Sequence, residues 1–202
     1  MALTIVYIDA FNLYYCALKG TAHRWLDIAA MSKAVLPKSC HIQAIKYYTA
    51  HISCRVDPTA PARQHAYLRA LGSLPGVTIY YGSFQVIEKW SGLVAPPDFR
   101  PPFVLPAGAA PKVARVWKTE EKGSDVNLGV HLVRDAFKAY FEEAAVLTND
   151  TDSRRAYPDC YARTRATRYF TCQSHETSSV PRCRFDRRPT HTALFRAAVS
   201  AS

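Results

Sequence analysis

The segment LTIVYIDAFN, residues 3–12, carries the strongest structural signal in this 202-residue chain. Its run from Leu3 to Ile8 is short, apolar and rich in β-branched residues, as expected of a strand buried on both faces. The run stops at Asp9, and Asn12 follows within one helical turn. A buried parallel strand that ends in a carboxylate predicts an α/β sheet with a candidate site at the carboxyl end of this strand.

Working outward from this segment, strand-like and helix-like stretches alternate as far as residue 152. Helices are predicted at Phe11–Leu18, Trp25–Leu36 and Pro61–Leu71. Strands are predicted at His41–Ile52, Val77–Phe84, Val113–Thr119 and Ala144–Asn149. Strands that alternate with helices pair in parallel through right-handed crossovers, so the chain is predicted to form an open, Rossmann-like parallel sheet flanked by helices.

Two further features interrupt or extend this pattern. Six of the thirteen prolines lie between residues 88 and 112, which predicts an inserted loop there. Ser124 has the character of an N-cap for a following helix, and an apolar stripe at helical spacing indicates its buried face. The stripe consists of Val126, Val130, Val133 and Phe137.

The net charge of +10 is spread unevenly along the chain. Residues 1–152 carry 16 Lys and Arg against 13 Asp and Glu, a net of +3, whereas residues 153–202 carry 10 Arg, no Lys and 3 acids, a net of +7. The nearly balanced body gives no electrostatic signature of its own. Its partner therefore has to be inferred from individual side chains.

Carboxylates occur at three places that a parallel sheet brings to one edge. Asp9 and Asp150 directly follow strands, Asp152 comes two residues later, and Asp125 lies in the first turn of a helix. Neighbouring strands are only ~4.8 Å apart, so ionised carboxylates at this edge would repel one another unless a cation lies between them. An oxygen-only ligand set suits Mg²⁺ or Mn²⁺. Taken singly, each acid is equally suited to capping a helix or forming a turn.

The elements YIDAFNLYY, WKTEEKGSDVNLGVHLVRDAF and AAVLTNDTD, in this order, resemble the NYN domain, in particular its bacterial LabA-like branch within the PIN-like nuclease superfamily. The resemblance spans residues 3–152. It implies a Rossmann-like domain that binds a divalent metal and cleaves RNA, with metal ligands at Asp9, Asp125 and Asp150. Asn12 and Asp152 would be the supporting catalytic pair.

Lys122 lies just before Gly123, which suits a close turn into the helix. Lys122 could contact a phosphate of the substrate, although a solvated surface lysine is the more ordinary interpretation. Glu120 and Glu121 are not expected to be metal ligands; a solvated pair of acids explains them as well.

Residues 153–202 do not continue the pattern of the body. Frequent Arg, Pro and polar clusters break nearly every apolar run, so this tail is predicted to lack a stable continuation of the domain. Its composition resembles a translated wrong reading frame; the competing interpretation is an arginine-rich arm that binds RNA. A zinc site is a minor alternative, because the four soft ligands lack a paired CxxC motif. They are Cys160, Cys172, His175 and Cys183.

The predicted function is therefore a metal-dependent ribonuclease, with an inactive nucleic-acid-binding or regulatory module of the same fold as the alternative. A dinucleotide binder is disfavoured because no G-x-G-x-x-G follows Ile8, and a phosphotransferase would want a second acid where Phe11 stands. No apolar run reaches the ~18 residues of a membrane span, and we expect a cytoplasmic protein with reduced cysteines. The sequence leaves a homo-oligomer open.

Overall fold

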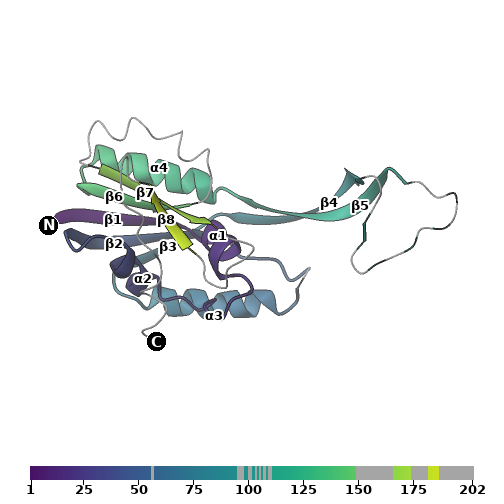
Figure 1. Ribbon diagram of the computed structural model, residues 1–202, viewed down its shortest axis with the longest axis horizontal. Coiled ribbons are helices and arrows are strands. Elements are labelled where there is room, and N and C mark those ends of the chain that lie inside the picture. The colour runs from purple at the N-terminus through teal and green to yellow at the C-terminus, as the bar shows by residue number, and fades with distance from the viewer. Residues whose placement is uncertain are drawn as a thin grey trace.

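The computed structural model describes residues 1–148, apart from 56, 95–97, 100, 101, 103, 105, 107 and 109–110, together with the backbone of residues 166–173 and 182–186. A six-stranded sheet in the order β3-β2-β1-β6-β7-β8 forms its centre (Figure 1). Its strands are β1 (Ala2–Asp9), β2 (Cys40–Thr49), β3 (Val77–Tyr81), β6 (Glu143–Leu147), β7 (Ala166–Gln173) and β8 (Arg182–Asp186). All neighbours pair in parallel except β8, which is antiparallel to β7. The predicted α/β, Rossmann-like class is confirmed.

Helices cover both faces of the sheet. In Figure 1, α2 (Ile28–Val35) and α3 (Ala60–Gly72) lie on one side of it and α4 (Ser124–Phe137) on the other. The side chains of β1 alternate between the two cores, with Val6 and Ile8 facing α2 and α3, and Ile5 and Tyr7 facing α4. This explains why the strand is apolar at every position from Ile5 to Ile8: both of its faces are covered.

The strand order creates a topological switch point between β1 and β6. From β1 the chain moves outward to β2 and β3, and it then returns to place β6 on the opposite side of β1. Crossovers on the two sides of β1 therefore leave in opposite directions, and ligands of open α/β sheets bind outside the carboxyl ends of the strands at such a switch point. Asp9 ends β1, and Thr148 directly follows β6.

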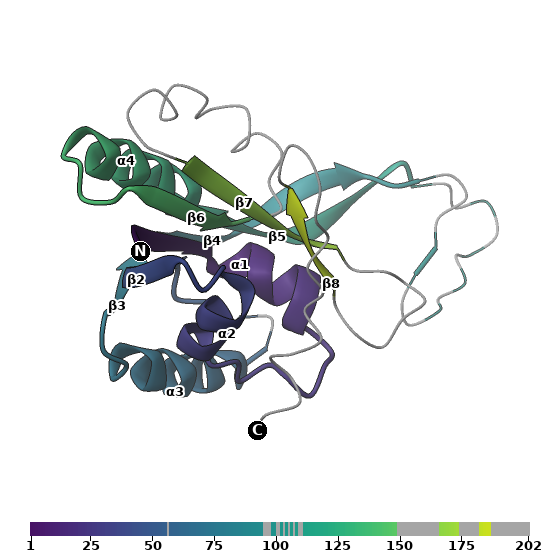
Figure 2. The ribbon, with the colours of Figure 1, turned by 60° about the vertical axis from the view of Figure 1, so that its left-hand side comes forward.

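A two-stranded antiparallel ribbon takes up residues 88–92 of the predicted loop, and its second strand begins at Val113, where a strand was predicted. It consists of β4 (Ser83–Gly92) and β5 (Val113–Lys122), which pair from Ser83 opposite Lys122 to Gly92 opposite Val113. The prediction of one strand over Val77–Phe84 was wrong, because the chain leaves the sheet at Gly82 and enters the ribbon. The ribbon projects from the carboxyl edge of the sheet (Figures 1 and 2).

Helix α4 occurs where it was predicted, but two details differ. Ser124 is the first residue of the helix, and the N-cap is Gly123, whose φ of 91° lies in the left-handed region that glycine adopts readily. The face that packs on the sheet contains Leu128, Leu132 and Ala136. The predicted stripe lies elsewhere, since Val126, Val130 and Phe137 are exposed.

The tail also differs from the prediction at two segments. Strand β7 pairs with β6 from Ala166 opposite Glu143 to Phe170 opposite Leu147, and β8 pairs with β7. Residues 166–173 and 182–186 thus extend the sheet, and in these two segments the expectation of no continuation was wrong. The four candidate zinc ligands have no described side chains, so that alternative lies outside the described part of the chain. Among the described residues, no helix has the length and apolar character needed to cross a membrane.

Candidate functional site at the carboxyl edge of the sheet

Asp9 is the best-defined polar side chain at the switch point. It is 2% exposed and caps α1 (Ala10–Leu13), which continues into a π-helical turn at Tyr14–Leu18. The backbone N–H of Asn12 donates to Oδ1 of Asp9 over 3.0 Å, and the Asn12 side-chain amide donates to Oδ2. The two residues, which lie within one helical turn in the sequence, are thus in direct contact, and the helix cap is one reason for it.

Thr148 bridges the two strands that flank the switch point. Its hydroxyl donates to Oδ2 of Asp9 over 3.2 Å, and the residue is 4% exposed. Three donors thus hold a buried carboxylate in one orientation, and a carboxylate with about four lone-pair sites retains capacity for a further partner. Sequence analysis missed Thr148; its position directly after a buried strand was the available signal.

The start of α4 lies at the same edge of the sheet. The Ser124 hydroxyl donates to the carbonyl of Thr49 over 3.2 Å, which places this end of the helix at the end of β2. Asp9 is paired with Tyr48 in the adjoining strand, so the second residue of α4, the exposed Asp125, starts from a position near the edge that Asp9 occupies. The predicted convergence of these two acids is compatible with this register.

Glu121 supports the start of α4 rather than standing in solvent as a simple charge. Its carboxylate accepts a 2.9 Å hydrogen bond from the backbone N–H of Ser124. A negative group at this end of a helix satisfies an otherwise unpaired N–H and interacts favourably with the helix dipole. The interpretation of Glu121 as a simple solvated acid therefore missed its role at the start of the helix.

Lys122 is exposed at the base of the ribbon, where its ammonium lies 2.8 Å from Oε2 of Glu120. Lys118 pairs with the other carboxylate oxygen, and hydrogen bonds from Lys118 and Lys122 lower the pKa of Glu120 to about 2. The proposed phosphate contact of Lys122 would have to replace or share this exposed ion pair, which costs little.

Asp150 and Asp152 lie outside the described residues. Within the described ranges, no three His, Cys, Asp or Glu side chains gather as a metal site. At the Asp9 edge the described polar side chains are the Asp9 carboxylate, the Asn12 amide and the Thr148 hydroxyl, and the latter two donate to Asp9. A carboxylate oxygen is a ligand that Mg²⁺ and Mn²⁺ accept, and the choice of metal stays a prediction from the sequence.

Stacked aromatic rings flank the Asp9 edge. The ring of Phe11 is stacked between Tyr15, at 6.4 Å between centroids, and Phe84 of the ribbon, at 6.0 Å. Tyr15 is 56% exposed, and the ammonium of Lys19 lies 4.7 Å from its ring centroid. Sequence analysis missed this group because its members come together only when the ribbon folds back beside α1.

A buried polar network beneath α4 anchors the helix to the sheet. Asp135 is fully buried and forms an ion pair with Lys46, and the Tyr7 hydroxyl donates to its Oδ2 over 2.8 Å. Arg134 donates to Oδ1 through Nε and Nη2. Burial alone would raise the pKa of Asp135, but these donors outweigh it and hold the pKa below its ordinary value. The network is separate from Asp9 and accounts for the orientation of α4.

Comparisons with known proteins give one named relative. The chain is 32% identical to 6-hydroxy-3-succinoylpyridine 3-monooxygenase HspA of Pseudomonas putida over 174 residues, which cover 74% of this chain and 52% of that protein. The chain therefore spans about half the length of this relative. No family model matches the chain.

One solved structure is similar, a protein of unknown function from Vibrio parahaemolyticus. It has a TM-score of 0.45 and 15% sequence identity, and the match covers 84% of this chain and 81% of that chain. Neither similarity bears on the NYN resemblance, which stays a prediction.

Proposed function

We propose that the Asp9 edge is the site of a metal-dependent ribonuclease. The observation that carries this proposal is the buried Asp9 carboxylate at the switch point, held by Asn12 and Thr148 with acceptor capacity to spare. Ligands of open α/β sheets bind at this position. In this proposal Asp9, Asp125 and Asp150 hold Mg²⁺ or Mn²⁺, and Asp152 assists them.

The chain's own residues have distinct tasks in this proposal. Asn12 and Thr148 fix the orientation of the Asp9 carboxylate, because both donate hydrogen bonds to it. Lys122 is close enough in sequence to the start of α4 to meet a substrate phosphate after leaving Glu120. A bound divalent cation would lower the pKa of a water molecule and neutralise charge on the attacked phosphate.

The test is cleavage of an end-labelled single-stranded RNA by the purified chain with Mg²⁺ or Mn²⁺. Cleavage should stop with chelator, and Asp9→Asn should lower its rate by at least roughly 100-fold. Asn also caps helices well, so this variant should stay folded. Asp57→Asn, which removes an exposed acid paired with Arg63, is the matched control and should retain activity. Undiminished cleavage in chelator would contradict the metal mechanism; RNA binding without cleavage would favour the inactive-module alternative.

A second candidate function is monooxygenation of a hydroxylated pyridine ring. The observation that favours it is the 32% identity to a protein named for this activity. The stacked rings of Phe11, Tyr15 and Phe84 beside Asp9 are a surface on which an aromatic substrate could stack.

A monooxygenase consumes O₂ and two electrons from a reductant for each oxygen atom inserted, which makes the two candidates separable. The measurement is O₂ uptake by the chain with NADH, added flavin and 6-hydroxy-3-succinoylpyridine. Uptake that depends on the pyridine and leaves RNA intact would replace the nuclease proposal with this second one.

A further inference from the structure

One face of the β4–β5 ribbon carries both of its tryptophans. The pairing register places Glu88 opposite Trp117 and Trp90 opposite Arg115, so all four side chains belong to the same face. Trp90 and Trp117 are diagonal neighbours across the two strands, within reach of each other's large side chains. They are 66% and 53% exposed. Large aromatic side chains grouped at such exposure mark an interaction surface.

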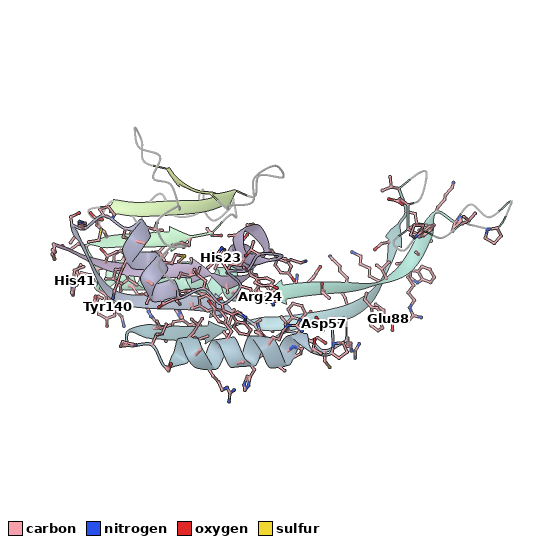
Figure 3. All side chains as sticks on the ribbon, turned by 60° about the horizontal axis from the view of Figure 1, so that its bottom comes forward. His23, Arg24, His41, Asp57, Glu88 and Tyr140 are labelled. Atoms are coloured by element: carbon pink, nitrogen blue, oxygen red, sulfur yellow. The ribbon has the colours of Figure 1, made fainter. Side chains whose placement is uncertain are left out.

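This tryptophan face is continuous with the Asp9 edge. Phe84 belongs to the same face, at the base of the ribbon opposite Glu121, and its ring stacks on Phe11 of α1. The six residue steps from Phe84 to Trp90 span ~20 Å at ~3.3 Å per step. Figures 1 and 2 both show the ribbon leaving the sheet beside α1, and Figure 3 shows Glu88 well out along it. An occupant of this face would therefore reach the candidate site at its inner end.

The tryptophan face combines exposed aromatic rings with positively charged side chains, a combination that suits a ligand with several flat rings and negative charges. The Arg55 guanidinium lies 5.3 Å from the Trp117 ring centroid, and Arg115 forms an ion pair with Glu88 between the tryptophans. The opposite face of the ribbon carries Lys89, together with Lys118 and Lys122, which are both paired with Glu120. Lysines are depleted in the cores of protein–protein interfaces, whereas aromatic rings among cations are the platform that single-stranded nucleic acids use.

We propose that a single-stranded nucleic acid lies along the tryptophan face, with bases stacked on Trp90 and Trp117, and runs past Phe84 to the Asp9 edge. The inference rests on the proposed ribonuclease function where it concerns cleavage of the bound strand. The binding surface itself is inferred from the contacts of the ribbon alone. The ~20 Å path accommodates about six nucleotides at the ~3.4 Å rise of a stacked strand. Because stacking requires unpaired bases, duplexes should bind more weakly.

The experiment measures fluorescence anisotropy of a fluorescein-labelled twelve-nucleotide oligouridine, with chelator present so that no cleavage occurs. Trp90→Leu and Trp117→Leu should each raise the dissociation constant about tenfold, and Trp117→Phe, which retains a ring, should raise it less. Trp25→Leu is the matched control. Trp25 is 52% exposed but lies off the ribbon, against Tyr67, and its loss should leave the affinity unchanged.

Two results would overturn the proposal. One is an unchanged affinity in both ribbon variants. The other is loss of a dimer in light scattering without a change in oligouridine affinity, which would assign the tryptophan face to a second copy of this chain. The two readouts separate this inference from the ribonuclease proposal, because oligouridine binding is measured with chelator present, whereas cleavage is measured with Mg²⁺ or Mn²⁺. Tryptophan-dependent binding by a chain that does not cleave RNA would support the binding surface and contradict the ribonuclease proposal.

Discussion

Asp135 is the residue whose replacement should affect stability most directly. It is fully buried, and Asp135→Asn would leave the ammonium of Lys46 buried without its counter-charge. Breaking a buried pair in this way costs about 3–5 kcal/mol of unfolding free energy. The matched control is Asp57→Asn, which breaks a solvent-exposed pair with Arg63 and should cost far less unfolding free energy. Urea unfolding of both variants provides the measurement; equal costs would contradict the assignment.

The same carboxylate predicts how stability depends on acid. Its pKa is lower in the folded protein than in the unfolded chain, because the donors from Lys46, Tyr7 and Arg134 outweigh burial. The stabilisation is complete above the unfolded pKa of about 3.9 and is lost as the pH falls through the lower folded pKa. Urea unfolding between about pH 5 and pH 2 should therefore show a shallower pH dependence in Asp135→Asn than in the wild type.

The candidate site shows which functional residues can be identified from the sequence and which cannot. Asp9 and Asn12 could be identified because each follows a clear strand signal within a few positions. Thr148 is 139 positions from Asp9, and its role depends on β1 and β6 being neighbours. Such a contact has no local signature, because it is created by strand order alone.

At the scale of elements, the junction between the sheet and the ribbon depends on Gly82. A Cβ there would lie 2.6 Å from the Lys122 carbonyl and 2.7 Å from Oε1 of Glu121. Gly82→Ala should therefore destabilise the fold by about 1–3 kcal/mol, since backbone atoms cannot yield as a flexible side chain can. Gly72→Ala is the control, because a Cβ there would meet only Ile79, at 4.0 Å. This substitution should stabilise α3 by roughly 0.5–1 kcal/mol, since alanine favours a helix more than glycine does. Thermal unfolding that ranks them in the reverse order would contradict this account.

The ribbon was predicted only in part: the strand expected at Val113–Thr119 lies within β5, whereas β4 was not expected as a separate strand. Strand signals rest on burial of one or both faces, and most side chains of β4 are exposed. The prolines that indicated a loop all lie between Gly92 and Val113, so they mark the connection rather than the strands. The loop predicted over residues 88–112 therefore wrongly included the outer end of β4 together with the proline-rich connection that follows it.

For the whole molecule, the strands of the tail have a measurable role. β7 pairs with the full length of β6, so a chain ended at Asp152 would expose the backbone N–H and C=O groups along that edge of β6. Exposed edges of buried strands promote association. We expect the shortened chain to unfold at a lower temperature and to elute as larger species in size-exclusion chromatography. A shortened chain as stable and monodisperse as the full one would show that β6 needs no such cover.

The alternation of buried strands and helices, and the acid at the end of β1, could be inferred from sequence alone because both are local: periodicity reports burial within a few residues. Tertiary structure alone decided three other features. It set the bridge from Thr148 to Asp9, the stacking of Phe84 on Phe11, and the choice of which face of α4 is buried. In α4 both faces carry apolar residues, so helical spacing was ambiguous. Packing against the sheet selected the face of Leu128, Leu132 and Ala136 because its residues fill the space above β1, β2 and β6.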